Sequence, residues 1–177
     1  MHRGLGERKL YRLREAGLIH PVGRGLYRRH DAAKDVDLDL LEVAIRAPEA
    51  TLCLTTALAR HDLVDAIPST IDVAIPRGRR KPAVSAAVSW HLFDVGTFQV
   101  GREEIEIEPG VAIGLYSAER SIVDLARLRH LEGSDQVYET LKRWLRRPGS
   151  KPAALLALAR QFPAAERVLR QALEILL

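Results

Sequence analysis

The hydrophobic positions of the chain change from helical spacing to alternation and back, which divides the sequence into predicted elements. Apolar residues recur every three or four positions near the N-terminus and through the C-terminal third. This spacing predicts helices at residues 8–16, 36–45, 56–61, 118–131, 136–145, 152–160 and 163–177. Short β-branched or alternating runs predict strands at 71–75, 87–92, 98–100, 105–107 and 111–116. The expected class is α+β, with a small, mainly antiparallel sheet followed by C-terminal helices.

The first predicted helix has one apolar side and one basic side. The apolar side carries Leu10, Leu13 and Gly17. The other side carries Arg8, Tyr11, Arg12 and Glu15, with Lys9 and Arg14 at its borders. Gly17 can end the helix, and Gly23 and Gly25 allow a tight turn that places Arg24 at the tip of a hairpin. A basic helix followed by a basic hairpin is the order of recognition helix and wing in a winged-helix protein. An ordinary surface helix and hairpin with solvated arginines is the alternative for this stretch.

Basic residues are concentrated in the same stretch. The whole chain has a net charge of +4, yet residues 1–30 contain eight lysines and arginines and only two glutamates. This asymmetry favours a nucleic-acid partner, because neutralised phosphates release counterions and so supply most non-specific affinity. We therefore predict double-stranded DNA contacts from Arg8, Lys9, Tyr11, Arg12, Arg14, Arg24, Arg28 and Arg29. A basic tail that binds an acidic protein is the alternative interpretation.

A polar stretch without periodicity, residues 30–37, separates the basic segment from the rest of the chain. We predict a partial winged-helix module at residues 1–33 and an α+β domain at residues 34–177. In the larger domain, Thr55 and Ser117 can cap the helices that follow them, and Arg120 can pair with Asp124 four residues later. Cys53 is the only cysteine and has apolar neighbours, so we expect it to be buried.

A second basic segment follows directly after the predicted strand at 71–75. It contains Arg77, Arg79, Arg80 and Lys81. We predict that this patch reaches flanking DNA or an acidic surface of a protein partner. A solvated loop without a partner is the alternative.

The sequence offers little for catalysis. The six histidines lack metal-ligand spacing, and there is no cysteine pair, nucleophile elbow or glycine-rich phosphate loop. One predicted strand carries Glu103, Glu104, Glu106 and Glu108, but alternation divides them between two faces. We therefore expect no enzyme activity, catalytic residue, cofactor or metal site. No apolar run approaches the roughly 18 residues that span a bilayer, and no signal peptide precedes the first helix, which predicts a cytoplasmic protein.

Four segments carry a resemblance to a known family. They are residues 13–27 (LREAGLIHPVGRGLY), 54–63 (LTTALARHDL), 71–80 (IDVAIPRGRR) and 117–129 (SAERSIVDLARLR). In this order they resemble the AbiEi family of antitoxins from type IV toxin–antitoxin systems. The resemblance implies a winged helix that binds the operator of its own operon as a transcriptional repressor, and a C-terminal α+β antitoxin domain. It also implies a cognate nucleotidyltransferase-like toxin in a phage-defence operon, and no enzyme activity.

The sequence departs from the family pattern at its beginning. A winged helix buries its recognition helix against two preceding helices, whereas few residues precede Arg8. We therefore expect a truncated module. Either the true start lies upstream of Met1, or the chain is a remnant whose Leu10 and Leu13 pack on the C-terminal domain. Such a module should bind DNA more weakly than one extended by two helices.

Three functional classes stay open. The first is a DNA-binding antitoxin and repressor, and the second is a toxin-neutralising interaction protein that has lost DNA binding. The third is a nuclease that uses the acidic strand. The sequence names neither the operator nor the toxin, and it leaves open whether the chain forms a homo-oligomer.

Overall fold

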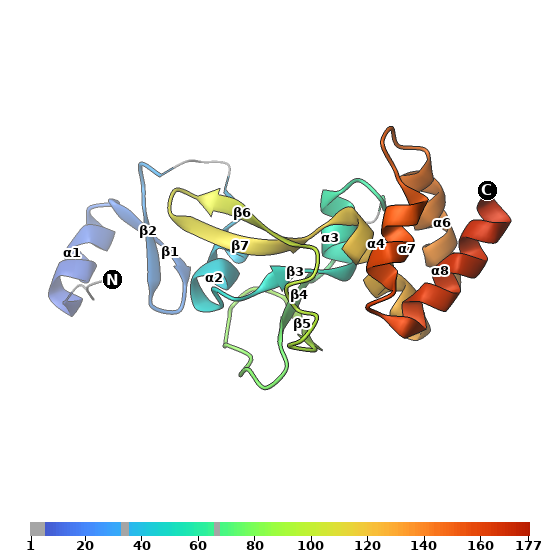
Figure 1. Ribbon diagram of the computed structural model, residues 1–177. Coiled ribbons are helices and arrows are strands. Elements are labelled where there is room, and N and C mark those ends of the chain that lie inside the picture. The colour runs from blue at the N-terminus through green and yellow to red at the C-terminus, as the bar shows by residue number, and fades with distance from the viewer. Residues whose placement is uncertain (1–5, 33–35, 66–67) are drawn as a thin grey trace.

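The structure is a computed structural model that describes residues 6–32, 36–65 and 68–177 (Figure 1). Its helices are α1 (Glu7–Glu15), α2 (Leu38–Arg46), α3 (Leu54–Arg60), α4 (Ala118–Arg127), α5 (Arg129–Glu132), α6 (Ser134–Leu145), α7 (Pro152–Ala159) and α8 (Pro163–Leu176). Its strands are β1 (Ile19–Gly23), β2 (Leu26–Arg29), β3 (Thr51–Leu52), β4 (Ile71–Pro76), β5 (Val88–Phe93), β6 (Arg102–Glu108) and β7 (Val111–Tyr116). The predicted α+β class is confirmed. None of the helices described is long and apolar enough to cross a membrane.

The strands form a two-stranded hairpin, β1-β2, and one larger sheet in the order β5-β4-β3-β7-β6. In the larger sheet, β3 pairs with β4 and β6 with β7 in antiparallel fashion. The β4–β5 and β3–β7 pairs are parallel. The sheet is thus mixed, which corrects the expectation of a mainly antiparallel one. Hydrophobic alternation indicates which residues face the core, but it does not indicate the direction of a strand. The long loop at residues 77–87 returns the chain before β5 begins, so that β5 runs parallel to β4.

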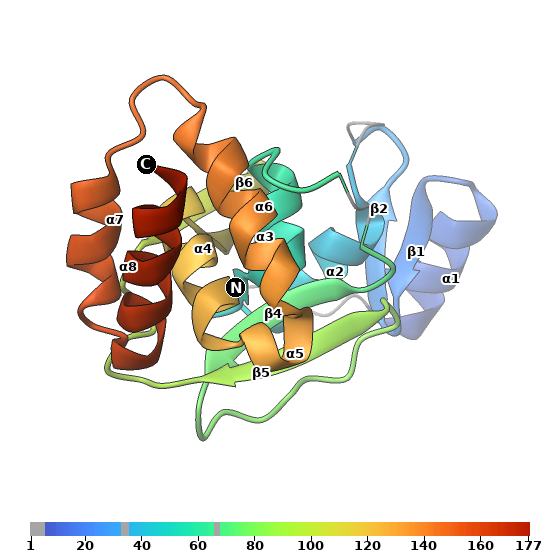
Figure 2. The same ribbon diagram turned by 90° about the vertical axis from the view of Figure 1, so that its right-hand side faces the viewer.

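The two faces of the sheet contact different layers. Val73 and Ile75 of β4 face a cluster with α2, whereas Ala74 faces a cluster with Phe93 and Tyr116. Figures 1 and 2 show α2 on one side of the sheet and α3 and α4 on the other. α4 is the centre of the helical layer, because α3, α6, α7 and α8 all pack against it. This arrangement gives residues 36–177 an extensive core.

The segment between β5 and β6 differs from the sequence prediction. We predicted a strand at residues 98–100, but residues 95–101 form successive turns. Phe98 is nevertheless buried, and its carbonyl accepts a hydrogen bond from Tyr116 Oη at 2.8 Å. An apolar residue in a turn can fill a core position as well as one in a strand, so the apolar pattern did not distinguish the two.

The helix starts are partly as predicted. Ser117 Oγ accepts the backbone N–H of Arg120 at 3.2 Å, which confirms the predicted cap of α4. The predicted cap at Thr55 is wrong, because the chain enters α3 at Leu54, directly after β3. The predicted helix at 118–131 is divided into α4 and α5 at Leu128. Cys53 is buried as expected, and burial raises the pKa of its thiol.

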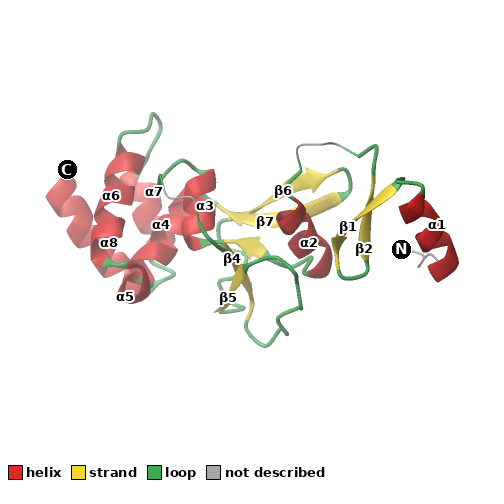
Figure 3. Cartoon of the chain, turned by 180° about the vertical axis from the view of Figure 1, so that it is seen from behind, coloured by secondary structure: helices red, strands yellow, loops and turns green. Residues whose placement is uncertain are grey.

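The N-terminal elements have the predicted order. β1 and β2 pair from Ile19 opposite Arg29 to Gly23 opposite Leu26, and the turn between them contains Gly25 at a φ of 73°. α1 has no buried residue, and Leu10 and Leu13 stay half-exposed. Figures 1 and 3 show the hairpin between α1 and the rest of the molecule. Leu10 and Leu13 therefore do not find a buried site on the C-terminal domain, which corrects that alternative.

Candidate nucleic-acid interface

The basic side of α1 is exposed along its length. The five predicted contact residues of this helix, Arg8, Lys9, Tyr11, Arg12 and Arg14, are all exposed. The Arg14 guanidinium lies 5.7 Å from the centre of the Tyr11 ring. Within the described part of the chain, Arg8, Lys9 and Arg12 form no ion pair or side-chain hydrogen bond. Their charges are thus available to an external partner.

The arginines of the hairpin have different surroundings. Arg24 is exposed in the turn. Arg28 is mostly covered, with 13% of its side chain exposed, and its Nε donates to Glu108 Oε1 at 2.9 Å. Arg29 is exposed, and its Nε donates to Asp31 Oδ1 at 2.9 Å, a hydrogen bond that lowers the pKa of Asp31. The structure therefore shows that Arg28 docks the hairpin on the sheet, and the DNA contact that we predicted for it stays a prediction.

The second basic segment lies in the loop between β4 and β5. Its side chains, Arg77, Arg79, Arg80 and Lys81, are all exposed. Arg79 forms an ion pair with the carboxylate of Glu49: its Nη2 donates to Oε1 at 3.0 Å, and its Nε lies 2.9 Å from Oε2. Figures 1 and 3 show this loop and the hairpin turn on the same side of the molecule.

Arg46, which the sequence did not single out, joins the hairpin turn to the basic loop. It is the last residue of α2, and its Nη2 donates to the carbonyl of Arg24. Together with Arg79 and Arg80, Arg46 also lines an open hollow of about 340 Å³. Arg46 thus contacts the backbone of the hairpin turn and shares the hollow with two arginines of the basic loop. The signal in the sequence was an acidic residue, Glu42, on the apolar side of the predicted helix, four residues before Arg46.

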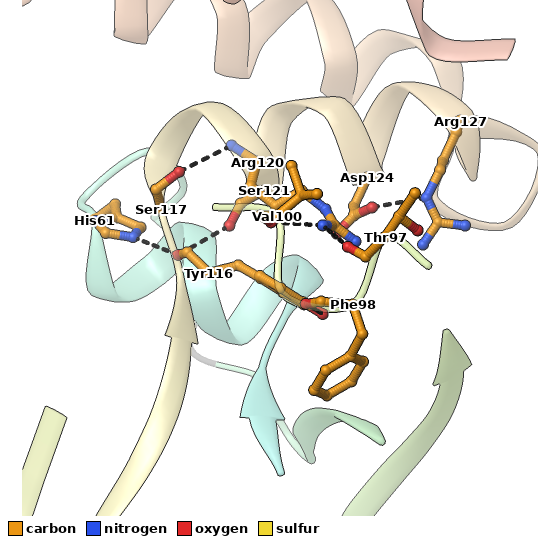
Figure 4. Close-up of polar contacts among 10 residues, drawn as sticks. All are labelled: His61, Thr97, Phe98, Val100, Tyr116, Ser117, Arg120, Ser121, Asp124 and Arg127. Atoms are coloured by element: carbon orange, nitrogen blue, oxygen red, sulfur yellow. Dashed lines mark hydrogen bonds and ion pairs between the residues drawn. The ribbon is translucent and has the colours of Figure 1, made fainter. Parts of the chain in front are cut away.

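A buried polar cluster lies at a distance from this surface, in the helical layer (Figure 4). Arg120 is fully buried and donates to Asp124 at 3.0 Å, as the spacing predicted. Its Nη1 also donates to the carbonyls of Thr97 and Val100, at 2.7 and 2.6 Å. The Arg120 guanidinium lies 4.3 Å from the centre of the Tyr116 ring, and burial raises the pKa of that tyrosine. These contacts fix the turns at 95–101 on α4, so we assign the cluster to stability.

The acidic strand does not form a metal centre. Glu108 pairs with Arg28, and Glu106 accepts the backbone N–H of Gly110 at 3.0 Å. Glu104 pairs with Arg102 at 3.1 Å. Among the side chains that the structure describes, no group of three or more histidine, cysteine, aspartate or glutamate residues is placed to hold a metal ion. Nothing in this arrangement supports the nuclease interpretation.

Comparison with models of protein families gives no match. Comparison with curated protein sequences gives no significant match either.

Proposed function

We propose that this chain is a DNA-binding antitoxin of the AbiEi type, which represses its own operon and neutralises a nucleotidyltransferase-like toxin in the cytoplasm. The observation that carries the proposal is the meeting of two exposed basic segments at Arg46. The hairpin turn presents Arg24, and the loop presents Arg79 and Arg80 around the hollow. Exposed guanidinium groups on two neighbouring segments suit a phosphate backbone, because each neutralised phosphate releases bound counterions.

α1 extends this basic surface. Arg8, Lys9 and Arg12 are exposed and form no ion pair among the described residues, and arginine and lysine side chains of a recognition helix contact base edges and phosphates in the major groove. In this assignment α1 enters the groove and the hairpin turn contacts the backbone beside it. Arg77 to Lys81 then reach the flanking phosphates.

The segments that resemble AbiEi also support the proposal. Residues 54–63 contain α3, residues 71–80 contain β4, and residues 117–129 contain α4. α3 packs against both β4 and α4. The resemblance thus covers one contiguous part of the structure together with the hairpin, and we assign toxin neutralisation to residues 34–177.

A second candidate function is a toxin-neutralising interaction protein that does not bind DNA. The observation in its favour is that α1 has no buried residue, so that few contacts fix its orientation. The two candidates differ in one property. The first needs sequence-specific DNA binding, and the second needs only the complex with the toxin.

Fluorescence anisotropy with a duplex from the region upstream of the native operon tests the first candidate. We expect tighter binding to this duplex than to a scrambled duplex of the same length and composition, with an affinity that falls steeply as salt rises. A parallel co-expression experiment tests whether the chain restores the growth of cells that express the adjacent toxin. Rescue without DNA binding would favour the second candidate. A chain that neither binds the duplex nor restores growth would exclude both candidates.

A further inference from the structure

Glu42 is the buried group on which the two basic segments converge. It lies in the middle of α2, and 1% of its side chain is exposed. Its Oε1 accepts a hydrogen bond from Arg46 Nε at 3.0 Å. Its Oε2 accepts the backbone N–H groups of Ser85 and Ala86, at 2.7 and 3.3 Å. Ser85 and Ala86 lie at the end of the loop that carries Arg77 to Lys81, so one carboxylate holds both that loop and Arg46.

The hairpin turn rests on the same carboxylate. Gly23 passes so close to it that a Cβ atom at position 23 would overlap Glu42 Oε1. Arg46, which Glu42 orients, donates to the carbonyl of the next residue, Arg24. The absence of a side chain at Gly23 therefore lets the turn dock directly over the buried carboxylate.

We infer that Glu42 is a positioning residue that holds the hairpin turn and the 77–87 loop as one surface for a nucleic-acid backbone. The inference rests on the proposed DNA binding and adds the group that sets the spacing of its two basic segments. A carboxylate suits this position because three N–H donors point at its two oxygens, and both oxygens are acceptors. Glutamine has one oxygen, so in either orientation its NH₂ group would face an N–H donor.

The test compares Glu42→Gln with Glu166→Gln. Glu166, with 28% of its side chain exposed, controls for the loss of a charge paired with an arginine four residues later, Arg170, in a helix far from the basic surface. We expect Glu42→Gln to speed hydrogen exchange at the backbone amides of the hairpin and of Ser85 and Ala86 together, while the amides of β6 and β7 keep their rates. We expect the same variant to bind the operon duplex roughly tenfold more weakly at one fixed salt concentration.

Gly23→Ala approaches the contact from the hairpin and leaves the carboxylate in place. We expect it to speed hydrogen exchange at the hairpin amides, as Glu42→Gln does. It also tests the inference if the Glu42→Gln variant does not fold. Combining Gly23→Ala with Glu42→Ala removes the overlap, so the added methyl group should then have less effect on hairpin exchange than in the wild-type background.

The results test the inference about Glu42 and the proposed DNA binding separately. Unchanged exchange at the hairpin in folded Glu42→Gln would overturn the inference. A released hairpin with unchanged DNA affinity would also overturn it, because the surface would then not depend on the carboxylate. If the wild-type chain bound no DNA at any salt concentration, the proposed function would fail, whereas the exchange data would still decide whether Glu42 joins the two segments.

Discussion

Asp124 is shared between two arginines inside the protein. One carboxylate oxygen accepts from Arg120 at 3.0 Å and the other accepts from Arg127 at 2.7 Å, while the aspartate itself is fully buried. A buried charge is tolerated only while its partners remain in place, because removal of one partner leaves a desolvated charge without compensation. The stability of the helical layer should therefore respond strongly to this group.

We expect Arg120→Met to lower the free energy of unfolding by about 3–5 kcal/mol, because it removes a partner of Asp124 and two hydrogen bonds to the 95–101 turns. Replacing the pair together, as Arg120→Met with Asp124→Leu, should recover part of that loss, because both fully buried charges are removed, while Arg127, with 24% of its side chain exposed, can still be hydrated. Urea unfolding followed by circular dichroism measures both variants. If the Arg120→Met variant were as stable as the wild type, the cluster would not stabilise the fold.

The contact between Arg28 and Glu108 separates docking of the hairpin from DNA binding, because hydrogen exchange measures the docking alone. We expect Arg28→Glu to increase hydrogen exchange in the hairpin, because two carboxylates would then face each other. The exchanged pair, Arg28→Glu with Glu108→Arg, should restore protection and bind DNA as the wild type does. If the variant with the exchanged pair restored protection of the hairpin but bound DNA weakly, Arg28 itself would be assigned a contact with DNA.

The sequence predicted the Arg120–Asp124 contact within one helix, but it missed the Glu42–Arg46 pair and the contacts between distant segments. The spacing of Arg120 and Asp124 was enough to pair them, because residues four apart share one side of a helix. Nothing local indicated that this pair would be buried, since Thr97 and Phe162 come from other elements. Arg46 and Glu42 were missed for the same reason, because their partners Arg24 and Ser85 are brought to them only by the fold.

At the scale of elements, α1 and α8 represent opposite cases. α8 buries Ala165, Leu169, Ala172 and Leu173 against the helical layer, whereas α1 buries no residue. Periodicity predicted both helices equally well. It could not show which apolar side would find a partner, because that depends on what the rest of the chain places beside it.

This contrast predicts unequal effects of leucine truncation. Leu169→Ala should lower the free energy of unfolding by about 2–5 kcal/mol, because it leaves a cavity in a closely packed layer. Leu10→Ala with Leu13→Ala should cost about 1 kcal/mol or less, because both side chains are half-exposed and little packing is lost. Equilibrium unfolding in urea gives both values. A large loss from the α1 variant would mean that this helix has a buried partner.

At the scale of the whole molecule, a basic edge lies at one end and a helical layer at the other. Figure 3 shows α1 and the hairpin at the end opposite α6 and α8, with the mixed sheet between them. The α+β class and most element positions followed from the sequence. The parallel pairs of the sheet and the meeting of the hairpin turn with the 77–87 loop did not, because both depend on how the chain crosses over between elements.

The most direct test of the account is the salt dependence of DNA binding by Arg24→Ala, Arg80→Ala and the double variant. The slope of log K against log salt is negative, and if the turn and the loop form one surface, each single variant should reduce its magnitude by about one and the double variant by about two. Each change should weaken binding to specific and scrambled duplexes alike, because phosphate contacts carry no sequence information. Unchanged slopes in all three variants would contradict the claim that the hairpin turn and the basic loop bind DNA together.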